Sequence, residues 1–196
     1  MTKKQANQIL GAALVVLGFA SFDASAQAVS PSGGTEGSSD ALDLGASVPD
    51  ARAVTEGLFP EDACDQLKAA GFRCMGFKPA LRYALPTSSF KPGSADLPEG
   101  LRKQLDVFAL ALKTRRGAHR QVRIEGHTDA SGSPAANVAL SQRRAEAVKD
   151  YLVQLGADPS QLSAIGLGAS EPRDPKNPLA AENRRIEIAR APGGGN

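Results

Sequence analysis

The chain has 196 residues, a length that suits one domain with appendages rather than two full domains. Its formal charge of +2 argues against nucleic acid as the main partner, because phosphate binding needs a strong basic excess. Tryptophan is absent, whereas glycine and proline number 20 and 13, so much of the chain is expected to form loops or linkers.

Residues 1–26 have the three parts of a secretory signal peptide. Lys3 and Lys4 form a basic start, residues 9–22 form an apolar stretch, and Ala24-Ser25-Ala26 fits the small-x-small cleavage pattern. A retained membrane anchor is the alternative, but a span needs about 20 apolar residues. We therefore expect cleavage before Gln27 and export. No cysteine lies near the cleavage point, so a lipid-modified N-terminus is not expected.

Residues 27–57 are rich in Ser, Gly, Ala and Asp and contain almost no large apolar side chains. Such a stretch buries too little apolar surface to offset the entropy lost on ordering. We therefore expect a flexible tether here.

Residues 58–80 contain the two cysteines, Cys64 and Cys74. In an oxidising compartment a disulfide between them is expected, and it would stabilise the fold by about 2–3 kcal/mol in the chain-entropy model. A metal site is the alternative, but further Cys or His residues at metal-site spacing are missing from the sequence.

Regular periodicity begins at residue 81 and continues to about residue 190. Apolar residues alternate with polar ones, as in half-buried strands, near residues 81–85, 122–124 and 186–188, and residues 162–166 have the form of a short apolar strand. They recur at helical spacing over 97–112 and between Ser133 and Gly156, where Ser133-Pro134 has the form of a helix start and Gly156 that of a helix end. The order βαβαββ predicts an α/β (α+β) two-layer sandwich, with two main helices on one face of a mixed sheet. Residues 191–196 are expected to be a disordered tail.

Arg144 is out of place in the second predicted helix. It lies four residues from both Leu140 and Val148 and so falls inside the apolar arc of that helix. An unpaired buried guanidinium costs several kcal/mol, so Arg144 must either extend to solvent at the helix edge or meet an anion. Periodicity alone leaves both interpretations open.

The loop before this helix, GHTDASGSPAAN over residues 126–137, joins a strand end to a helix start. Ligand crevices of α/β folds commonly form at such junctions. Asp129 is the one acid in the loop, and a turn-forming role for it is equally open. Arg184 shares the face of Ile186 and Ile188 by strand parity, although an exposed strand-end arginine is the ordinary case.

The stretch HTDASGSPAANVALSQRRAEAVKDYL closely resembles the core motif of OmpA-like peptidoglycan-binding domains, as found in OmpA, Pal and MotB. Further matches are Phe90 with Ser94-Ala95-Asp96-Leu97, the pair Gly166 and Gly168, and Asn183-Arg184-Arg185 with Ile186-Glu187. The resemblance covers residues 81–190.

The resemblance implies non-covalent binding of peptidoglycan through the diaminopimelate of its stem peptide. In that family the Asp of HTD and the Arg of LSxxRA hold this residue, and they match Asp129 and Arg144 here. The chemistry agrees, because the zwitterionic end of diaminopimelate needs an anion for its ammonium and a two-pronged cation for its carboxylate. Asn137, Arg184 and Thr128 complete the expected set. The resemblance also implies a periplasmic protein associated with the outer membrane.

Lys91-Pro92 departs from the family pattern, since many relatives have an acidic residue after the phenylalanine. This departure makes a ligand contact from the first loop doubtful.

Catalysis is not expected, although His127, Asp129 and Ser131 or Ser133 are residues of the types that hydrolases use. Their adjacent spacing does not form a relay, and no nucleophile-elbow pattern is present. His119 and His127 lack a third metal ligand, so neither a metal nor a cofactor is expected.

A wall anchor of a membrane-embedded motor or secretion complex is the alternative function, and it would require a retained N-terminal helix. The sequence leaves open which envelope protein the N-terminal segment contacts. It also leaves open whether the basic run (Lys113, Arg115, Arg116, Arg120 and Arg123) is a site or a solvated face.

Overall fold

The computed structural model describes residues 41–74, 79–87, 90–115 and 120–191. The expected signal peptide, the first part of the expected tether and residues 192–196 lie outside these ranges. Within the described ranges, every helix is too short or too polar to cross a membrane.

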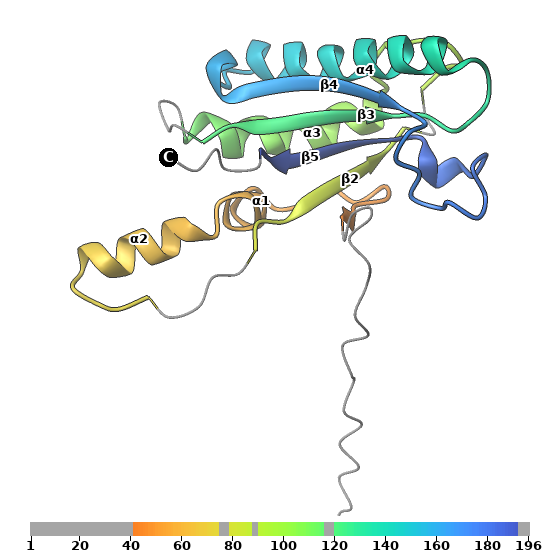
Figure 1. Cartoon of the computed structure of the whole chain (residues 1–196). Helices are drawn as coiled ribbons and strands as arrows, with labels where there is room; N and C mark the ends of the chain where they lie inside the picture. Colours follow the sequence, from red (N-terminus) through yellow and green to blue (C-terminus); the bar gives the residue numbers. More distant parts are fainter. Residues whose placement is uncertain (1–40, 75–78, 88–89, 116–119, 192–196) are drawn as a thin grey trace, which may run out of the picture. The chain divides into compact units, whose positions relative to one another are not determined.

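A mixed sheet and two long helices make up the main body (Figure 1). The strands in chain order are β1 (Leu42–Asp43), β2 (Arg82–Pro86), β3 (Val122–His127), β4 (Leu162–Gly168) and β5 (Arg185–Arg190), and their order in the sheet is β1-β2-β5-β3-β4. β5 runs antiparallel to both β2 and β3, whereas β4 is parallel to β3 and β1 is parallel to β2.

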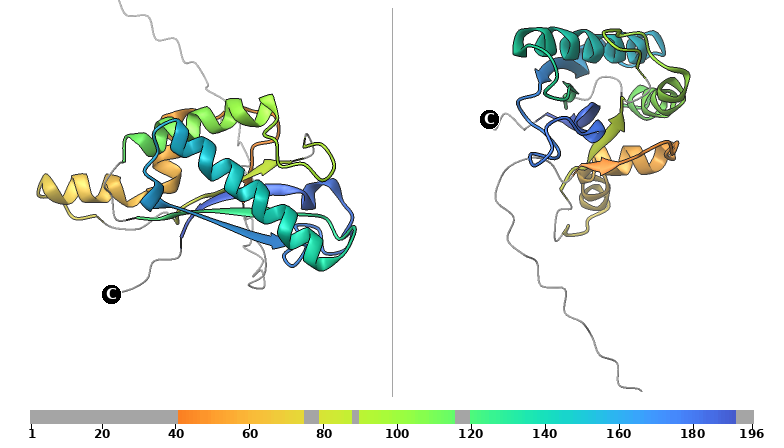
Figure 2. Two further views of the ribbon diagram at one scale, coloured as in Figure 1. Left: turned by 90° about the horizontal axis from the view of Figure 1, so that it is seen from above. Right: turned by 90° about the vertical axis from the view of Figure 1, so that its right-hand side faces the viewer.

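The helices α3 (Glu99–Lys113) and α4 (Pro134–Gln154) lie side by side on one face of this sheet (Figure 2). The short 3-10 helices Pro159–Gln161 and Ala181–Asn183 precede β4 and β5. From β2 onward the order is βαβαββ, so the predicted fold class is confirmed.

Local sequence explains where α4 begins and ends. The hydroxyl of Ser133 accepts a hydrogen bond from the Ala136 amide, and Pro134 occupies the first turn, where its missing N–H costs nothing. Gly156 follows the helix with a φ of +102°, a conformation that glycine adopts without strain. Between the helices and the sheet lies one apolar core, which includes Leu105, Phe108, Val148, Leu152, Ile124, Ile186 and Ile188.

Residues 41–57, the described part of the expected tether at residues 27–57, do not form a flexible tether. They contain β1 and nearly all of the helix α1 (Ala51–Leu58), which packs against α3. The carboxylate of Asp50 caps α1 by accepting from the amides of Arg52 and Ala53, and Val54 and Leu58 are fully buried in the main core. The prediction was wrong because two apolar residues four positions apart build a buried helical face despite a polar average. The folded unit therefore begins before residue 81.

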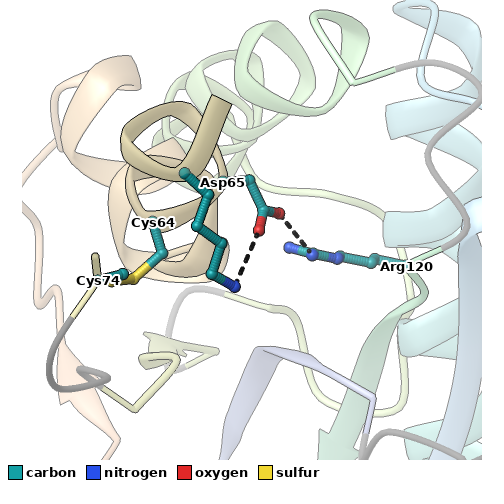
Figure 3. The surroundings of a disulfide bond; sticks show 5 residues. Cys64, Asp65, Cys74 and Arg120 are labelled. Atoms are coloured by element: carbon teal, nitrogen blue, oxygen red, sulfur yellow. Dashed lines mark hydrogen bonds and ion pairs between the residues drawn. A yellow bond between two sulfur atoms is a disulfide. The ribbon is translucent and has the colours of Figure 1, made fainter. Parts of the chain in front are cut away.

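The helix α2 (Glu61–Ala69) carries the cysteine pair. Cys64 on α2 and Cys74 after it form the predicted disulfide, with their Cα atoms 5.3 Å apart (Figure 3). Ion pairs attach α2 to the main body: Glu61 contacts Arg120 at 2.5 Å and also pairs with Arg190, and Asp65 contacts Arg120 at 3.3 Å.

Members of the basic run take part in this attachment. Arg120 pairs with α2 as just described, and Arg115 pairs with Asp62 on the same helix. Arg123 pairs with Glu125 on its own strand. These three arginines therefore pair with acidic side chains of the same chain rather than forming a free basic surface.

Reduction of the disulfide should expose α2 to proteases while the main body stays folded. Glu61 and Cys64 are the buried residues of α2, so little apolar packing holds this helix. Besides its ion pairs, the disulfide is therefore the main restraint on α2 and the turn that follows it. Trypsin should cut after Lys68 and Arg73 much faster in the reduced protein than in the oxidised one. Equal cleavage rates at these two positions would contradict this assignment, and cleavage after Arg143 in α4 serves as the control.

Candidate ligand-binding site

Asp129 lies in the loop between β3 and α4, and both of its carboxylate oxygens have partners. Oδ1 accepts hydrogen bonds from the amide of Ser131 at 3.0 Å and from the Ser131 hydroxyl, which makes the local turn considered above. Oδ2 forms an ion pair with Nη1 of Arg184 at 2.7 Å. The carboxylate of Asp129 therefore stabilises the local turn with one oxygen and forms an ion pair with the other.

Hydrogen bonds to backbone carbonyls fix the rest of this loop. The side-chain amide of Asn137 donates to the carbonyl of Asp129 at 3.2 Å, which ties the first turn of α4 to the loop. The amide of Thr128 donates to the carbonyl of Gly168 at 2.8 Å, and the amide of Ala130 donates to the carbonyl of Pro178 at 3.0 Å. The Thr128 hydroxyl is buried and has no hydrogen-bond partner within the described ranges.

Arg144 is 4% exposed, so it does not extend to solvent at the helix edge. Its Nε donates to the carbonyl of Ser94 at 3.0 Å, and Nη2 donates to that of Lys91 at 3.5 Å. The guanidinium carbon lies 4.7 Å from the centre of the Phe90 ring, a cation–π distance. Arg144 thus connects α4 to the loop between β2 and α3, and its Nη1 has no hydrogen-bond partner in the described part of the chain.

The charges of Asp129, Arg144 and Arg184 influence one another. Burial raises the pKa of Asp129, but hydrogen bonds from Ser131 and Arg184 outweigh it and bring that pKa below its ordinary value. Burial lowers the pKa of Arg144, the charge of Arg184 lowers it further, and Asp129 opposes both. Two cations facing one anion leave the group with an excess of positive charge.

Two glycines allow α4 to lie directly on the strands that carry this site. A Cβ atom at Gly126 would fall 2.2 Å from the carbonyl oxygen of Ser141, and one at Gly166 would fall 2.3 Å from the amide nitrogen of Gln142. Both contacts are with α4 backbone, which cannot yield cheaply. The close approach therefore fixes the helix turn that presents Arg144.

The sheet face opposite α3 and α4 holds a charged network that the sequence analysis missed. Arg82 pairs with both Glu125 and Glu187, and Arg185 pairs with Glu187 at 2.6 Å. Both glutamates are fully buried, and His127 beside them is 1% exposed. The signal in the sequence is the charge at alternate positions, Arg123, Glu125 and His127 on β3 and Arg185 and Glu187 on β5, opposite the apolar positions of the same strands.

Glu125, His127 and Glu187 bring ligand-type atoms within 4.8 Å of one another. The two glutamates are, however, already paired with Arg82, Arg123 and Arg185. A divalent cation would add charge to a group in which three arginines already exceed two carboxylates. The arrangement therefore fits an ion-pair network rather than a metal site.

His127 should make the protein less stable as the pH falls. Burial lowers the pKa of His127 to about 4, the charge of Arg185 adds to this effect, and that of Glu187 opposes it. Between this value and the ordinary value of 6.5, the unfolded histidine binds a proton that the folded one does not. The free energy of unfolding should therefore fall by roughly 1–2 kcal/mol between about pH 7 and pH 5.

Urea unfolding at several pH values measures this slope. His127→Gln should remove most of it, because glutamine does not titrate. An unchanged slope in that variant would show that His127 is not the group responsible.

The sequence is similar to those of known proteins. The OmpA family model matches residues 89–185. The chain is 41% identical over 113 residues to the peptidoglycan-associated lipoprotein of Pseudomonas aeruginosa, an alignment that covers 56% of this chain and 64% of that protein. It is 47% identical over 86 residues to the outer membrane porin F of Pseudomonas fluorescens, with coverage of 43% and 26%.

Among solved structures, the peptidoglycan-associated lipoprotein of Burkholderia pseudomallei is 30% identical and has a TM-score of 0.47. That alignment covers 55% of this chain and 89% of the Burkholderia chain. The chain spans just under two thirds of the length of the first two curated relatives. On the match of its family model and these identities, the chain belongs to the OmpA family.

Proposed function

We propose that the protein binds peptidoglycan without covalent chemistry, through the diaminopimelate of the stem peptide, and links an envelope component to the cell wall. The proposal rests mainly on the cluster of Asp129, Arg144 and Arg184. Asp129 and Arg144 are fifteen positions apart in sequence, yet the charge of each of these residues affects the others or is affected by them. Membership of the OmpA family supports it, because relatives are named peptidoglycan-associated lipoproteins. A relative named outer membrane porin F, beside the peptidoglycan-associated lipoproteins, supports a periplasmic protein near the outer membrane.

A carboxylate is the group that this cluster is best prepared to bind. Among the residues that the structure describes, Nη1 of Arg144 has no hydrogen-bond partner, and Arg184 pairs with Asp129 through its Nη1. The positive excess of the three side chains favours an anion, and a guanidinium holds a carboxylate with two parallel hydrogen bonds. The carboxylate on the side chain of diaminopimelate supplies such a group.

The ammonium of diaminopimelate must compete for Asp129. Because Arg184 occupies Oδ2 and Ser131 occupies Oδ1, an incoming ammonium has to share Oδ2 with Arg184 or displace it. The side chain of Arg184 is 35% exposed, so it has room to turn toward solvent. We propose that Arg184 holds Asp129 in place in the free protein and gives way when the ligand ammonium arrives.

A catalytic role for the same residues has little support in the geometry. Ser131 donates to Asp129 and His127 lies on the opposite face of the sheet, near Glu125 at 3.9 Å. With its pKa lowered to about 4, His127 is a poor general base, and its partners lie on the other side of the sheet from Asp129. The proposed function therefore needs neither a catalytic residue nor a cofactor.

Arg144→Lys tests the carboxylate contact. A lysine keeps the charge but cannot form two parallel hydrogen bonds, so affinity for a diaminopimelate stem peptide should fall by about tenfold or more. Arg144→Ala should abolish binding and also lower stability, because the carbonyls of Lys91 and Ser94 lose their donor. Calorimetry and urea unfolding separate these two effects.

The matched control is Arg143→Ala. Arg143 is the neighbouring arginine and is exposed, so its loss should leave both affinity and stability unchanged. If Arg144→Lys is folded and binds like the wild type, Arg144 has only its structural role.

Asp129→Asn tests the ammonium contact. It keeps the shape of the side chain and removes its charge, so affinity should fall about ten- to a hundredfold, the worth of one charge-assisted hydrogen bond. Asp158→Asn is the matched control, because Asp158 makes the same turn, with Ser160 donating to its Oδ1 from both amide and hydroxyl. Equal affinities for the two variants would remove Asp129 from the site.

A further inference from the structure

A groove lies between α1, α2 and the C-terminal half of α3, beside the disulfide. Its volume is about 1150 Å³. Its wall includes Phe59, Ala63, Leu67, Leu110 and Ala111, together with the two cysteines. The guanidinium of Arg115 lies 4.8 Å above the Phe59 ring, which is itself 2% exposed. The floor of the groove is therefore apolar. The helices that build it are separate from the wall-binding site, by which we mean Asp129, Arg144 and Arg184.

Large apolar side chains stand exposed around this groove. Leu67 is 46% exposed, Leu110 is 56% exposed, and Phe72, in the turn that closes the disulfide loop, is 64% exposed. The turn is held in place, because the amide of Phe72 donates to the carbonyl of Leu67 at 2.9 Å and Cys74 is crosslinked to α2. Exposed apolar groups gathered at one place mark an interaction surface. Phe72 immediately precedes Arg73, which lines the groove, so an exposed aromatic residue adjoins the apolar groove.

The charges around the groove nearly balance. Arg52 pairs with Glu56 at 2.6 Å, Arg115 pairs with Asp62, and Arg73 has no ion-pair or hydrogen-bond partner in the described ranges. Three cations against two anions leave a net charge of only +1, which repels a copy of the same surface weakly. A strongly charged surface would instead favour a partner of opposite sign.

We propose that the groove binds a second copy of this chain. In a two-fold arrangement each contact occurs twice, so Phe72 of each copy enters the groove of the other. Arg73, next to Phe72, then meets the exposed Glu56 at the rim of the opposite groove. Such a contact uses the exposed Phe72, the groove beside it, Arg73, and Glu56, which is 63% exposed and pairs with Arg52 in the single chain.

The dimer would leave both wall-binding sites open. α2 adjoins Arg120, which precedes β3, whereas Asp129 follows the other end of β3, and Figure 1 shows α2 and the β3–α4 connection at opposite ends of the sheet. Two sites on one dimer hold a polymeric ligand more tightly than one site does, because the second contact is intramolecular. The association itself does not depend on the proposed function.

Sedimentation velocity over a wide range of concentration tests the proposal on the disulfide-bonded chain purified from the periplasm. The wild type should shift from monomer to dimer as concentration rises. Phe72→Glu and Leu110→Glu should each weaken association at least tenfold, because each brings a charge into the apolar contact. Ile165→Glu, a matched change on the exposed face of β4, should associate like the wild type. A wild type that stays monomeric, or a Phe72→Glu variant that dimerises normally, would overturn the proposal.

A charge exchange tests the pairing of the two copies. Arg73→Glu alone and Glu56→Arg alone should each weaken the dimer, since each brings like charges together across the groove. The double variant should recover the wild-type association, because the pair is restored with opposite signs. Circular dichroism checks that every variant is folded. A double variant no stronger than the single ones would overturn the proposed geometry.

Discussion

The direct contact between α4 and the two parallel strands beneath it is the constraint on which the site depends. Gly126 and Gly166 have no side chains, so the backbone of α4 lies on the backbone of β3 and β4. The hydroxyl of Ser141 accepts a hydrogen bond from the Gly168 amide at 2.9 Å and fixes the height of the helix over the strands. The same contact determines where the loop after β3 must turn and where Arg144 emerges from the helix.

Arg144 then serves the fold and, in our proposal, the ligand. A guanidinium that is 4% exposed requires hydrogen-bond acceptors, and two loop carbonyls and the Phe90 ring meet part of that requirement. Because those acceptors are neutral, the positive charge itself stays uncompensated by them. Asp129 is partly neutralised by Arg184, so the cluster retains a preference for an incoming carboxylate. The free protein thus has an excess positive charge at this cluster, and the carboxylate of the proposed ligand would neutralise it.

Sequence reasoning succeeded where a local pattern determines structure. Ser133-Pro134 marked the start of α4, alternating residues marked β3 and β5, and two cysteines ten positions apart marked the disulfide. It failed for α1, because the composition of residues 27–57, averaged over the segment, is polar and does not reveal the helical pair Val54 and Leu58. The contacts of Arg144 were not predictable, because backbone carbonyls from a loop fifty positions away leave no trace in residue identity. The pair of Asp129 with Arg184 also joins distant segments, 55 positions apart.

In our proposal, the cluster of Asp129, Arg144 and Arg184 recognises the side-chain carboxylate of diaminopimelate. Two stem peptides that differ only in carrying diaminopimelate or lysine at the third position isolate that group, because lysine lacks this carboxylate and keeps the ammonium. Calorimetry on the wild-type protein should show the lysine peptide binding at least about tenfold more weakly, the loss expected for one charge-assisted pair. Equal affinities for the two peptides would contradict the account.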